Sequence, residues 1–210
     1  MHSGKDTVGS IIQDYTTRSS GHVKIIDGKP VPIMGPSRFT IKKWAGKLKT
    51  IASMMTGIEV ERFEEMDFKM TDLGPEWDSP EGIPMTVREF LQKLGTEAIR
   101  NGLHTNAWVN ALMSDYVTFT AVDKDNVMTH LNYFDWIITD TRFPNELKAV
   151  KDKGGITIQV RRGPKPTGPL HPSETALDDA EFDYVIDNNG TMEELAVKVS
   201  MILIAENIIQ

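Results

Sequence analysis

Apolar residues recur at every third or fourth position in several parts of the chain, and this spacing predicts amphipathic helices. The first helix covers about residues 5–18, where Val8, Ile11 and Ile12 fall on one face. Further helices are expected over residues 41–55, over 86–94, around Trp108 and Leu112, over 144–153, and from Thr191 onward. Two of them begin with a capping box, in which a glutamate follows a threonine by three residues: Thr86 with Glu89, and Thr191 with Glu194.

Short apolar runs alternate with helices in the second half of the chain and predict strands at residues 136–140, 156–160 and 183–187. This order of strands and helices implies a parallel sheet covered by helices. Segments rich in glycine, proline or serine are predicted to be irregular: residues 19–37, with a short extended piece at 22–26, residues 67–85 within an insert at about 57–85, and residues 163–172. We therefore expect one α/β domain over residues 1–210.

Composition narrows the function classes. The 210 residues are 40% hydrophobic, enough to bury a full core, and no apolar run approaches the roughly 20 residues that span a bilayer. A formal charge of −7 argues against nonspecific binding to nucleic acid, which normally needs a basic balance. The lack of cysteine suits a reducing compartment. We expect a cytoplasmic protein with neither a membrane nor a nucleic acid as partner.

The segment Gly4-Lys5-Asp6-Thr7 is similar to the end of a phosphate-binding loop. The glycine would let the backbone approach a phosphate, the lysine would reach its oxygens, and the following helix would add free N–H groups. The usual pattern has another glycine five positions before Gly4 and a buried strand before that, and both would precede Met1. Taken alone, this half-pattern favours a chance match.

Four other positions carry both a functional and a structural interpretation. Asp140 follows an apolar strand, where nucleotide-binding folds place a carboxylate near Mg²⁺, yet a capping role is equally compatible. Arg142 suits bidentate binding of phosphate, or a surface ion pair with Glu146. Arg161 and Arg162 precede the proline-rich loop and suit a lid over phosphates, although solvent-facing arginines are common there.

Two further features come from the middle of the chain. Arg88 and Arg100 flank an expected helix interruption at Gly95-Thr96, which would turn their side chains toward a cleft or simply end the helix. Trp108 suits stacking on a base, but a tryptophan within a helix more often packs in a core. Nothing in the spacing of the five histidines indicates a metal site.

Several ordered segments resemble the deoxynucleoside monophosphate kinases of bacteriophages, within the P-loop nucleoside monophosphate kinase group. The strongest stretch is Asp140-Thr141-Arg142-Phe143-Pro144-Asn145-Glu146. The others are Ser3-Gly4-Lys5-Asp6-Thr7, Ala45-Gly46-Lys47-Leu48-Lys49, Val87-Arg88 with Leu91-Gln92-Lys93-Leu94-Gly95-Thr96, Gly154-Gly155, Val160-Arg161, residues 171–174, and Asn188-Asn189-Gly190-Thr191.

This resemblance implies transfer of the γ-phosphoryl group of ATP to a deoxynucleoside 5′-monophosphate with Mg²⁺, giving the diphosphate. It implies catalytic roles for Lys5, Arg142 and Arg161, and a lid-like loop over about 161–174. The residues implied to contact ATP are Gly4, Lys5, Asp6, Thr7 and Arg162, of which Asp6 and Thr7 would hold the metal. The residues implied to bind the acceptor are Lys49, Arg88, Gln92, Thr96, Trp108, Asp140, Arg142, Glu146 and Glu174.

The fold implied is a P-loop kinase-like parallel sheet flanked by helices. We expect its first strand to be missing from this chain, through either a shortened start or a real truncation. Two alternatives remain: a non-catalytic nucleotide-binding protein with an incomplete phosphate loop, and an enzyme similar to dephospho-coenzyme A kinases. A homodimer is one option for the assembly, because the apolar last helix suits either a core or a subunit contact. A phage-encoded enzyme of this kind would act in the host cytoplasm.

Overall fold

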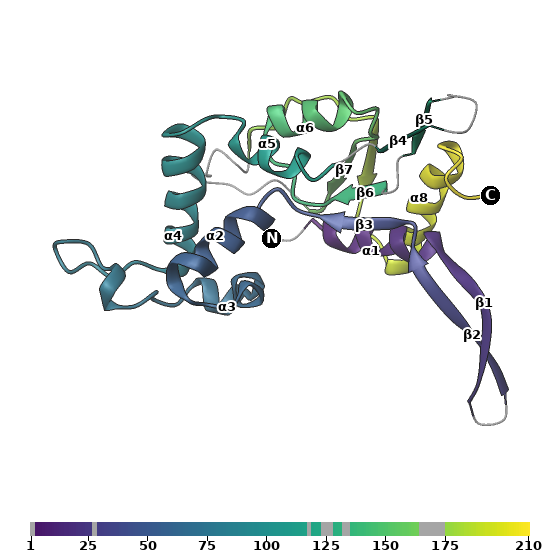
Figure 1. Cartoon of the computed structure of the whole chain (residues 1–210), viewed down its shortest axis with the longest axis horizontal. Coiled ribbons are helices and arrows are strands. Elements are labelled where there is room, and N and C mark those ends of the chain that lie inside the picture. Colours follow the sequence, from purple (N-terminus) through teal and green to yellow (C-terminus); the bar gives the residue numbers. More distant parts are fainter. Residues whose placement is uncertain (1–2, 27–28, 117–118, 123–127, 132–134, 164–174) are drawn as a thin grey trace. The chain divides into compact units, whose positions relative to one another are not determined.

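The computed structural model describes residues 3–26, 29–116, 119–122, 128–131, 135–163 and 175–210 (Figure 1). The chain divides into two compact units, one formed by Met1–Lys42 with Val117–Gln210 and the other by Lys43–Tyr116. The first unit carries parallel strand pairs with helices, and the second is built of helices. The second unit contains the whole of the insert expected at about 57–85. The expectation of a single domain stays a prediction.

Three predicted helices of the first unit are confirmed as α1 (Lys5–Thr16), α6 (Pro144–Lys151) and α8 (Met192–Ala205). The capping box of α8 is formed as expected, with the Thr191 hydroxyl accepting from the backbone N–H of Glu194. Helix α1 ends two residues earlier than predicted. Its end is closed because the hydroxyls of Thr16 and Thr17 donate to the carbonyls of the preceding turn, and Thr17 takes an extended conformation.

Two parallel strand pairs confirm the expected strand direction. Strand β3 (Phe39–Lys42) pairs with β6 (Asp135–Ile138), and β7 (Ile158–Arg161) pairs with β8 (Tyr184–Asp187). Among the described residues these are separate two-stranded ladders. The α/β class with parallel strands flanked by helices is thus confirmed. The helix predicted over 41–55 starts later, because Ile41 belongs to β3, where it pairs with Ile137 of β6.

The extended piece predicted at residues 22–26 is confirmed as part of β1 (Thr17–Ile26). The loop predicted over the rest of residues 19–37 is wrong, because β1 forms an antiparallel hairpin with β2 (Lys29–Ser37) (Figure 1). Prolines in β2 suggested irregular structure, yet a strand with one free edge tolerates residues that lack an N–H. A second antiparallel pair, β4 (Phe119–Val122) with β5 (Met128–Leu131), lies in a stretch where the sequence predicted no element.

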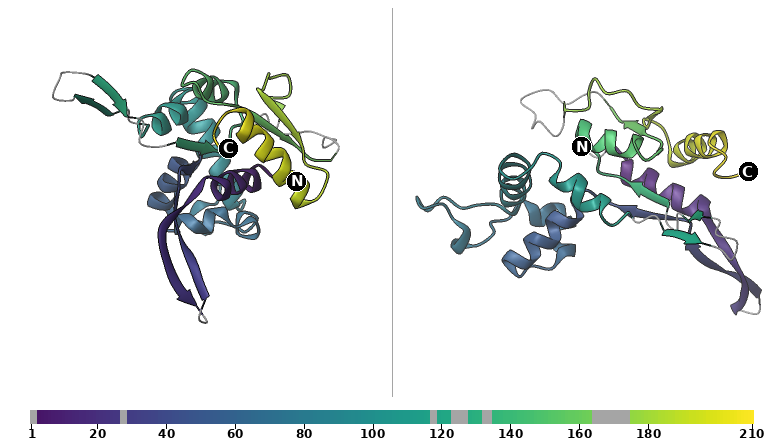
Figure 2. Two further views of the ribbon diagram at one scale, coloured as in Figure 1. Left: turned by 90° about the vertical axis from the view of Figure 1, so that its right-hand side faces the viewer. Right: turned by 45° about the horizontal axis from the view of Figure 1, so that its top comes forward.

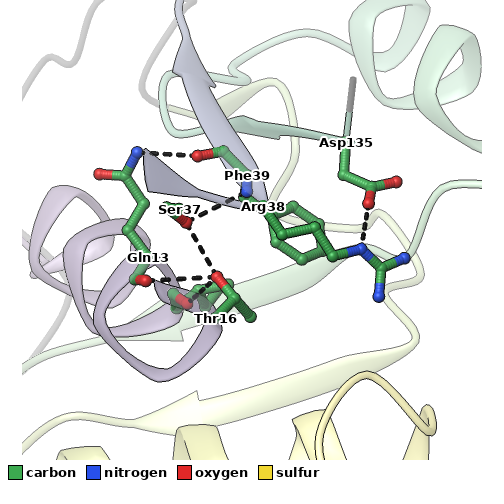
Figure 3. A network of polar contacts seen from close by, with 7 residues as sticks. Gln13, Thr16, Ser37, Arg38, Phe39 and Asp135 are labelled. Carbon is green, nitrogen blue, oxygen red and sulfur yellow. Dashed lines mark hydrogen bonds and ion pairs between the residues drawn. The ribbon is translucent and has the colours of Figure 1, made fainter. Parts of the chain in front are cut away.

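Polar contacts join the hairpin to α1 and to the first parallel pair (Figure 3). The hydroxyls of Thr16 and Ser37 lie 3.0 Å apart, and Ser37 Oγ accepts from the N–H of Phe39. Gln13 Nε2 donates to the Phe39 carbonyl at 3.0 Å. Arg38 forms an ion pair with Asp135 at the start of β6. The entry into β3 is therefore fixed by side chains from α1 and β6.

One hydrophobic core serves both parallel pairs. It joins α1, α8 and β8 through Val8, Ile11, Ile12, Ile186, Leu195, Val199, Ile202 and Leu203, and residues of all four parallel strands pack against it. Helices α1 and α8 lie side by side in both views of Figure 2. Since the apolar residues of α8 named above are buried here, this face of the last helix forms core. A Cβ added at Gly9 would come 2.7 Å from Thr139 Cγ2, so α1 crosses close to the end of β6.

The second unit packs helices around a small core of Ala52, Phe63, Val87 and Phe90. Its elements are α2 (Gly46–Thr56), η1 (Val60–Glu64), α3 (Met66–Lys69), η2 (Pro75–Trp77), α4 (Val87–Gln92), the π-helix η3 (Lys93–Asn101) and α5 (Ala107–Met113). Residues 67–85 hold only short helical pieces, which confirms that they are largely irregular. The capping box of Thr86 with Glu89 is confirmed at the start of α4.

The helix interruption expected at Gly95-Thr96 is wrong. The helix that begins at α4 continues through both residues as η3, with the wider turns of a π-helix. Gly95 is buried against Leu48, whose Cδ2 would lie 2.8 Å from an added Cβ. The glycine thus serves close packing of two helices.

Candidate functional site

The turn formed by residues 3–7, called here the 3–7 turn, opens helix α1. Gly4 caps the helix with φ 96° and ψ 13°, a left-handed conformation that glycine adopts without strain. A Cβ there would lie 2.3 Å from Asn188 Nδ2, so the position also lacks space for a side chain. A left-handed residue followed by helical ones turns successive N–H groups toward one point, which forms a concave site for an anion. The chain at Gly4 therefore has the conformation expected at a phosphate-binding loop.

Two strand ends hold this turn. Thr139, directly after β6, donates its hydroxyl to Asp6 Oδ1 at 2.7 Å. Asn188, directly after β8, donates its side-chain amide to the Ser3 carbonyl at 2.9 Å. Thr139 and Asn188 are only 5% and 9% exposed. The carboxyl ends of both parallel pairs thus meet at the N-terminus of α1, where open α/β sheets bind their ligands.

Residues 140–146, called here the 140–146 turn, connect the end of β6 to α6. Asp140 is half-buried and Arg142 is exposed. Glu146 is 2% exposed, and its Oε2 accepts from the backbone N–H groups of Arg142 at 2.8 Å and Phe143 at 3.1 Å. These contacts of Glu146 are with the backbone of the turn, and the surface ion pair with the Arg142 side chain stays a prediction. The carboxylate closes the turn and caps α6.

Two arginines expected in a lid lie at the end of β7. Arg161 is the last residue of that strand, and its Nε donates to Gln159 Oε1 at 2.8 Å. Arg162 follows it, and both are exposed. Asn189 Oδ1 accepts from the N–H of Gly163 at 2.7 Å, so the β8–α8 turn also holds the chain just after Arg162. Glu174 and most of the predicted lid, residues 164–174, lie outside the described residues.

In the second unit, three candidate acceptor residues follow one another at intervals of four. Arg88 is exposed in the first turn of α4, Gln92 ends α4 half-buried, and Thr96 is half-buried in η3. Side chains four residues apart on a helix lie on neighbouring positions of one face. These three positions thus form a row along the α4–η3 helix. Arg100 is buried and donates to the carbonyl of Thr105, so it is not placed as the sequence suggested.

Lys49 and Trp108 lie inside the second unit. Lys49 is buried and forms an ion pair with Glu64. Partial burial by itself would raise the pKa of Glu64, but the hydrogen bond and charge of Lys49, with the charges of Lys43 and Lys69, lower that pKa below its ordinary value. Trp108 is 7% exposed, and its Nε1 donates to the Gly95 carbonyl at 2.8 Å. Its ring therefore packs in the core rather than presenting a face for a base.

A metal at this site would depend on few protein ligands. Within the described ranges, no three histidine, aspartate or glutamate side chains gather as a metal site. Mg²⁺ keeps several waters and usually takes one or two carboxylates together with substrate phosphates. Asp6, exposed on the 3–7 turn, fits that mode of binding.

In the part of the chain that the structure describes, no helix combines the length and the apolar character of a membrane span.

Thr139 and Asn188 are contacts that the sequence did not single out. Thr139 immediately precedes Asp140, and Asn188 opens one of the segments on which the resemblance depends. Asn188 directly follows the strand predicted over 183–187, and Thr139 is the next-to-last residue of the strand predicted over 136–140. The carboxyl ends of parallel strands share one edge. That position, rather than the residue type, is the signal that would have identified them.

Parallel strands whose carboxyl ends meet a glycine-lysine turn at a helix N-terminus are typical of α/β proteins that bind phosphorylated ligands. The family described as deoxynucleotide monophosphate kinase matches residues 50–199, and the chain belongs to this family. The deoxynucleotide monophosphate kinase of Escherichia phage RB69 is 25% identical over 146 residues, which are 70% of this chain and 53% of that protein. The enzyme of the same name from Enterobacteria phage T4 is 33% identical over 114 residues, 54% of this chain and 44% of that protein. The chain thus spans about half the length of the curated relatives it matches.

Proposed function

We propose that this protein transfers the γ-phosphoryl group of ATP to a deoxynucleoside 5′-monophosphate and releases the diphosphate. The observation that carries the proposal is the family match over residues 50–199, which includes the 140–146 turn and the row of Arg88, Gln92 and Thr96. The relatives named above are deoxynucleotide monophosphate kinases. A P-loop kinase fold formed by both units as one domain, and action in a host cytoplasm, belong to the same proposal.

The donor is assigned to the 3–7 turn. Two polyanions must be brought into line for phosphoryl transfer, so the protein supplies position and positive charge rather than a covalent intermediate. The left-handed Gly4 and the start of α1 orient backbone N–H groups, and Lys5 adds a cation at the first helical position. Asp6 and Thr7 would hold Mg²⁺, which would supply neutralisation of the charge that develops during transfer.

The acceptor is assigned to cations outside that turn. Arg142 is exposed on the 140–146 turn, and its planar guanidinium suits the two oxygens of a 5′-phosphate. Asp140 would accept hydrogen bonds from the nucleotide. Arg88, Gln92 and Thr96 would contact it from the α4–η3 helix. Lys49, the last residue of the segment 45–49, would add a further cation. Arg161 and Arg162 would neutralise the transferring phosphates from the end of β7. Glu146 and Trp108, which are buried, would act by holding their neighbours in place.

The test is turnover by the unchanged chain and by Lys5→Ala, with labelled ATP and a panel of deoxynucleoside monophosphates, and with dephospho-coenzyme A as a further acceptor. Removing one phosphate-binding cation is expected to reduce kcat about 10²–10³-fold, the usual cost of losing one group that stabilises developing charge. Lys153→Ala, an exposed lysine after α6, is the matched control and should retain full activity.

Thermal unfolding of both variants separates a catalytic defect from misfolding. Full turnover by Lys5→Ala would contradict the assignment of the donor site. Binding of nucleotides without turnover by the unchanged chain would instead indicate a non-catalytic binder. Turnover with dephospho-coenzyme A alone would identify a different acceptor.

A further inference from the structure

We infer that Asn188 is a positioning residue for the phosphate-binding turn, a role that rests on the proposed function. Its side-chain amide donates to the Ser3 carbonyl at 2.9 Å, across 185 positions of sequence. Its backbone N–H donates to the carbonyl of Arg161 at 2.7 Å. Asn188 is itself buried at the end of β8. One residue thus ties the start of the 3–7 turn to the rigid ends of two parallel strands.

The contact determines where the Gly4 N–H points. In a planar trans peptide the carbonyl oxygen and the following N–H point in opposite directions, so fixing the Ser3 oxygen against Asn188 also fixes the Gly4 N–H. Glycine populates positive and negative φ about equally, and the turn alone therefore does not select the left-handed form. Selecting it aligns successive N–H groups into a site for an anion. The Asn188 tether thus orders the backbone that the proposal assigns to ATP.

An amide suits this position for two reasons. The Ser3 carbonyl needs a donor, which a carboxylate of the same shape does not offer. A carboxylate would also add negative charge beside the bound phosphates. The Cβ position of Gly4 lies only 2.3 Å from Asn188 Nδ2, so the tether and the glycine fit each other closely.

The experiment compares Asn188→Ala and Asn188→Asp with the unchanged chain in calorimetric binding of ATP and of a deoxynucleoside monophosphate, each alone. Loss of the tether is expected to raise the Kd for ATP about tenfold, the equivalent of one hydrogen bond that stabilises the binding conformation. The aspartate variant, which fits the same space, should raise it at least as much. The Kd of the monophosphate should stay within twofold.

Thr191→Ala is the matched control for stability. It removes the cap of α8 three residues further on but leaves the amide of Asn188 and the Ser3 carbonyl in place. This variant and Asn188→Ala should both unfold at a lower urea concentration than the unchanged chain, but Thr191→Ala should still bind ATP like the unchanged chain. In an NMR spectrum without ligand, the Gly4 and Lys5 amide signals should move in the Asn188 variants and not in Thr191→Ala.

The outcomes separate this role from the proposed function. If the unchanged chain binds ATP and both Asn188 variants bind it equally well, the positioning role is overturned while the kinase proposal stands. If all variants, including Thr191→Ala, lose ATP and monophosphate affinity in proportion to their stability, Asn188 is a structural residue only. If the unchanged chain binds no ATP and transfers no phosphate, the proposed function fails and this role fails with it.

Discussion

Glu146 offers a direct way to distinguish a residue that touches the acceptor from one that shapes its site. The resemblance implies substrate binding for this residue, but the carboxylate lies in the protein with 2% exposure. One of its oxygens accepts the N–H groups of Arg142 and Phe143, the two residues that directly precede α6. A carboxylate at this end of a helix is also favoured by the helix dipole. We therefore expect Glu146 to fix the 140–146 turn from within.

The contacts give the size of the effect. A hydrogen bond to a charged group contributes about 1.5–3 kcal/mol to the free energy of unfolding. The cost of burying the carboxylate charge offsets part of what the two hydrogen bonds contribute together. Glu146→Ala removes both contacts and leaves two N–H groups without their acceptor, so it should lower the free energy of unfolding by about 3 kcal/mol. Glu146→Gln keeps a carbonyl oxygen of the same reach and should lower it by about 1–2 kcal/mol.

Urea unfolding followed by circular dichroism measures the stability, and steady-state kinetics measures KM for the acceptor. If Glu146 acts through the turn, Glu146→Ala should raise KM together with its loss of stability, while Glu146→Gln retains most of the affinity. Asp152→Ala is the control, because Asp152 directly follows α6 and forms an exposed ion pair with Lys148 of that helix. This substitution should change the free energy of unfolding by no more than about 0.5 kcal/mol. Equal loss of affinity in both Glu146 variants with unchanged stability would refute the reasoning and indicate direct contact with the acceptor.

Two predictions test other parts of the structure. Trp108→Phe should lower the free energy of unfolding by about 1–2 kcal/mol, because the Gly95 carbonyl loses its indole donor, and should leave acceptor KM within twofold; a large rise in KM at unchanged stability would instead favour base stacking. The hydroxyl and backbone N–H of Thr157 donate to Asp183 and hold the pKa of Asp183 below its ordinary 3.8. A lowered pKa contributes stability that is fully present above about pH 4 and is lost as the pH falls through the folded-state pKa. Asp183→Asn should flatten this acid dependence in urea unfolding at pH 7 and pH 3, and an unchanged slope would contradict it.

The elements predicted best are those whose signals are local. The two capping boxes, Thr86 with Glu89 and Thr191 with Glu194, cap the N-termini of their helices through residues three positions apart. The whole interaction can therefore be read from a short stretch of sequence. The hairpin at residues 17–37 was missed for the opposite reason. Its prolines and glycines are typical of loops, and only pairing with another strand satisfies the remaining backbone groups. Likewise, Ile41 was predicted to lie in the helix over 41–55, but it forms part of β3 because it pairs with Ile137 of β6, 96 positions further along the chain.

The candidate site shows the same division between local and distant information. Residues 3–7 themselves allow the conformation of Gly4 at the start of α1, since a glycine adopts a left-handed cap without strain. The contacts that hold this turn come from Thr139 and Asn188, which lie 133 and 185 positions away from their partners. No spacing rule within the sequence connects residues so far apart. What connects them is the parallel arrangement of the strands they follow.

That arrangement gives a physical reason for the polar residues at strand ends. A buried strand offers few positions for polar side chains, but the first residue after its carboxyl end leaves the sheet while its backbone is still held by pairing. Thr139 after β6 and Asn188 after β8 occupy such positions, and each donates one hydrogen bond to the 3–7 turn. Because α1 packs on the same core as both strand pairs, the turn meets donors that are already fixed in place. If this turn binds a nucleotide as proposed, the cost of ordering it is met during folding rather than at binding.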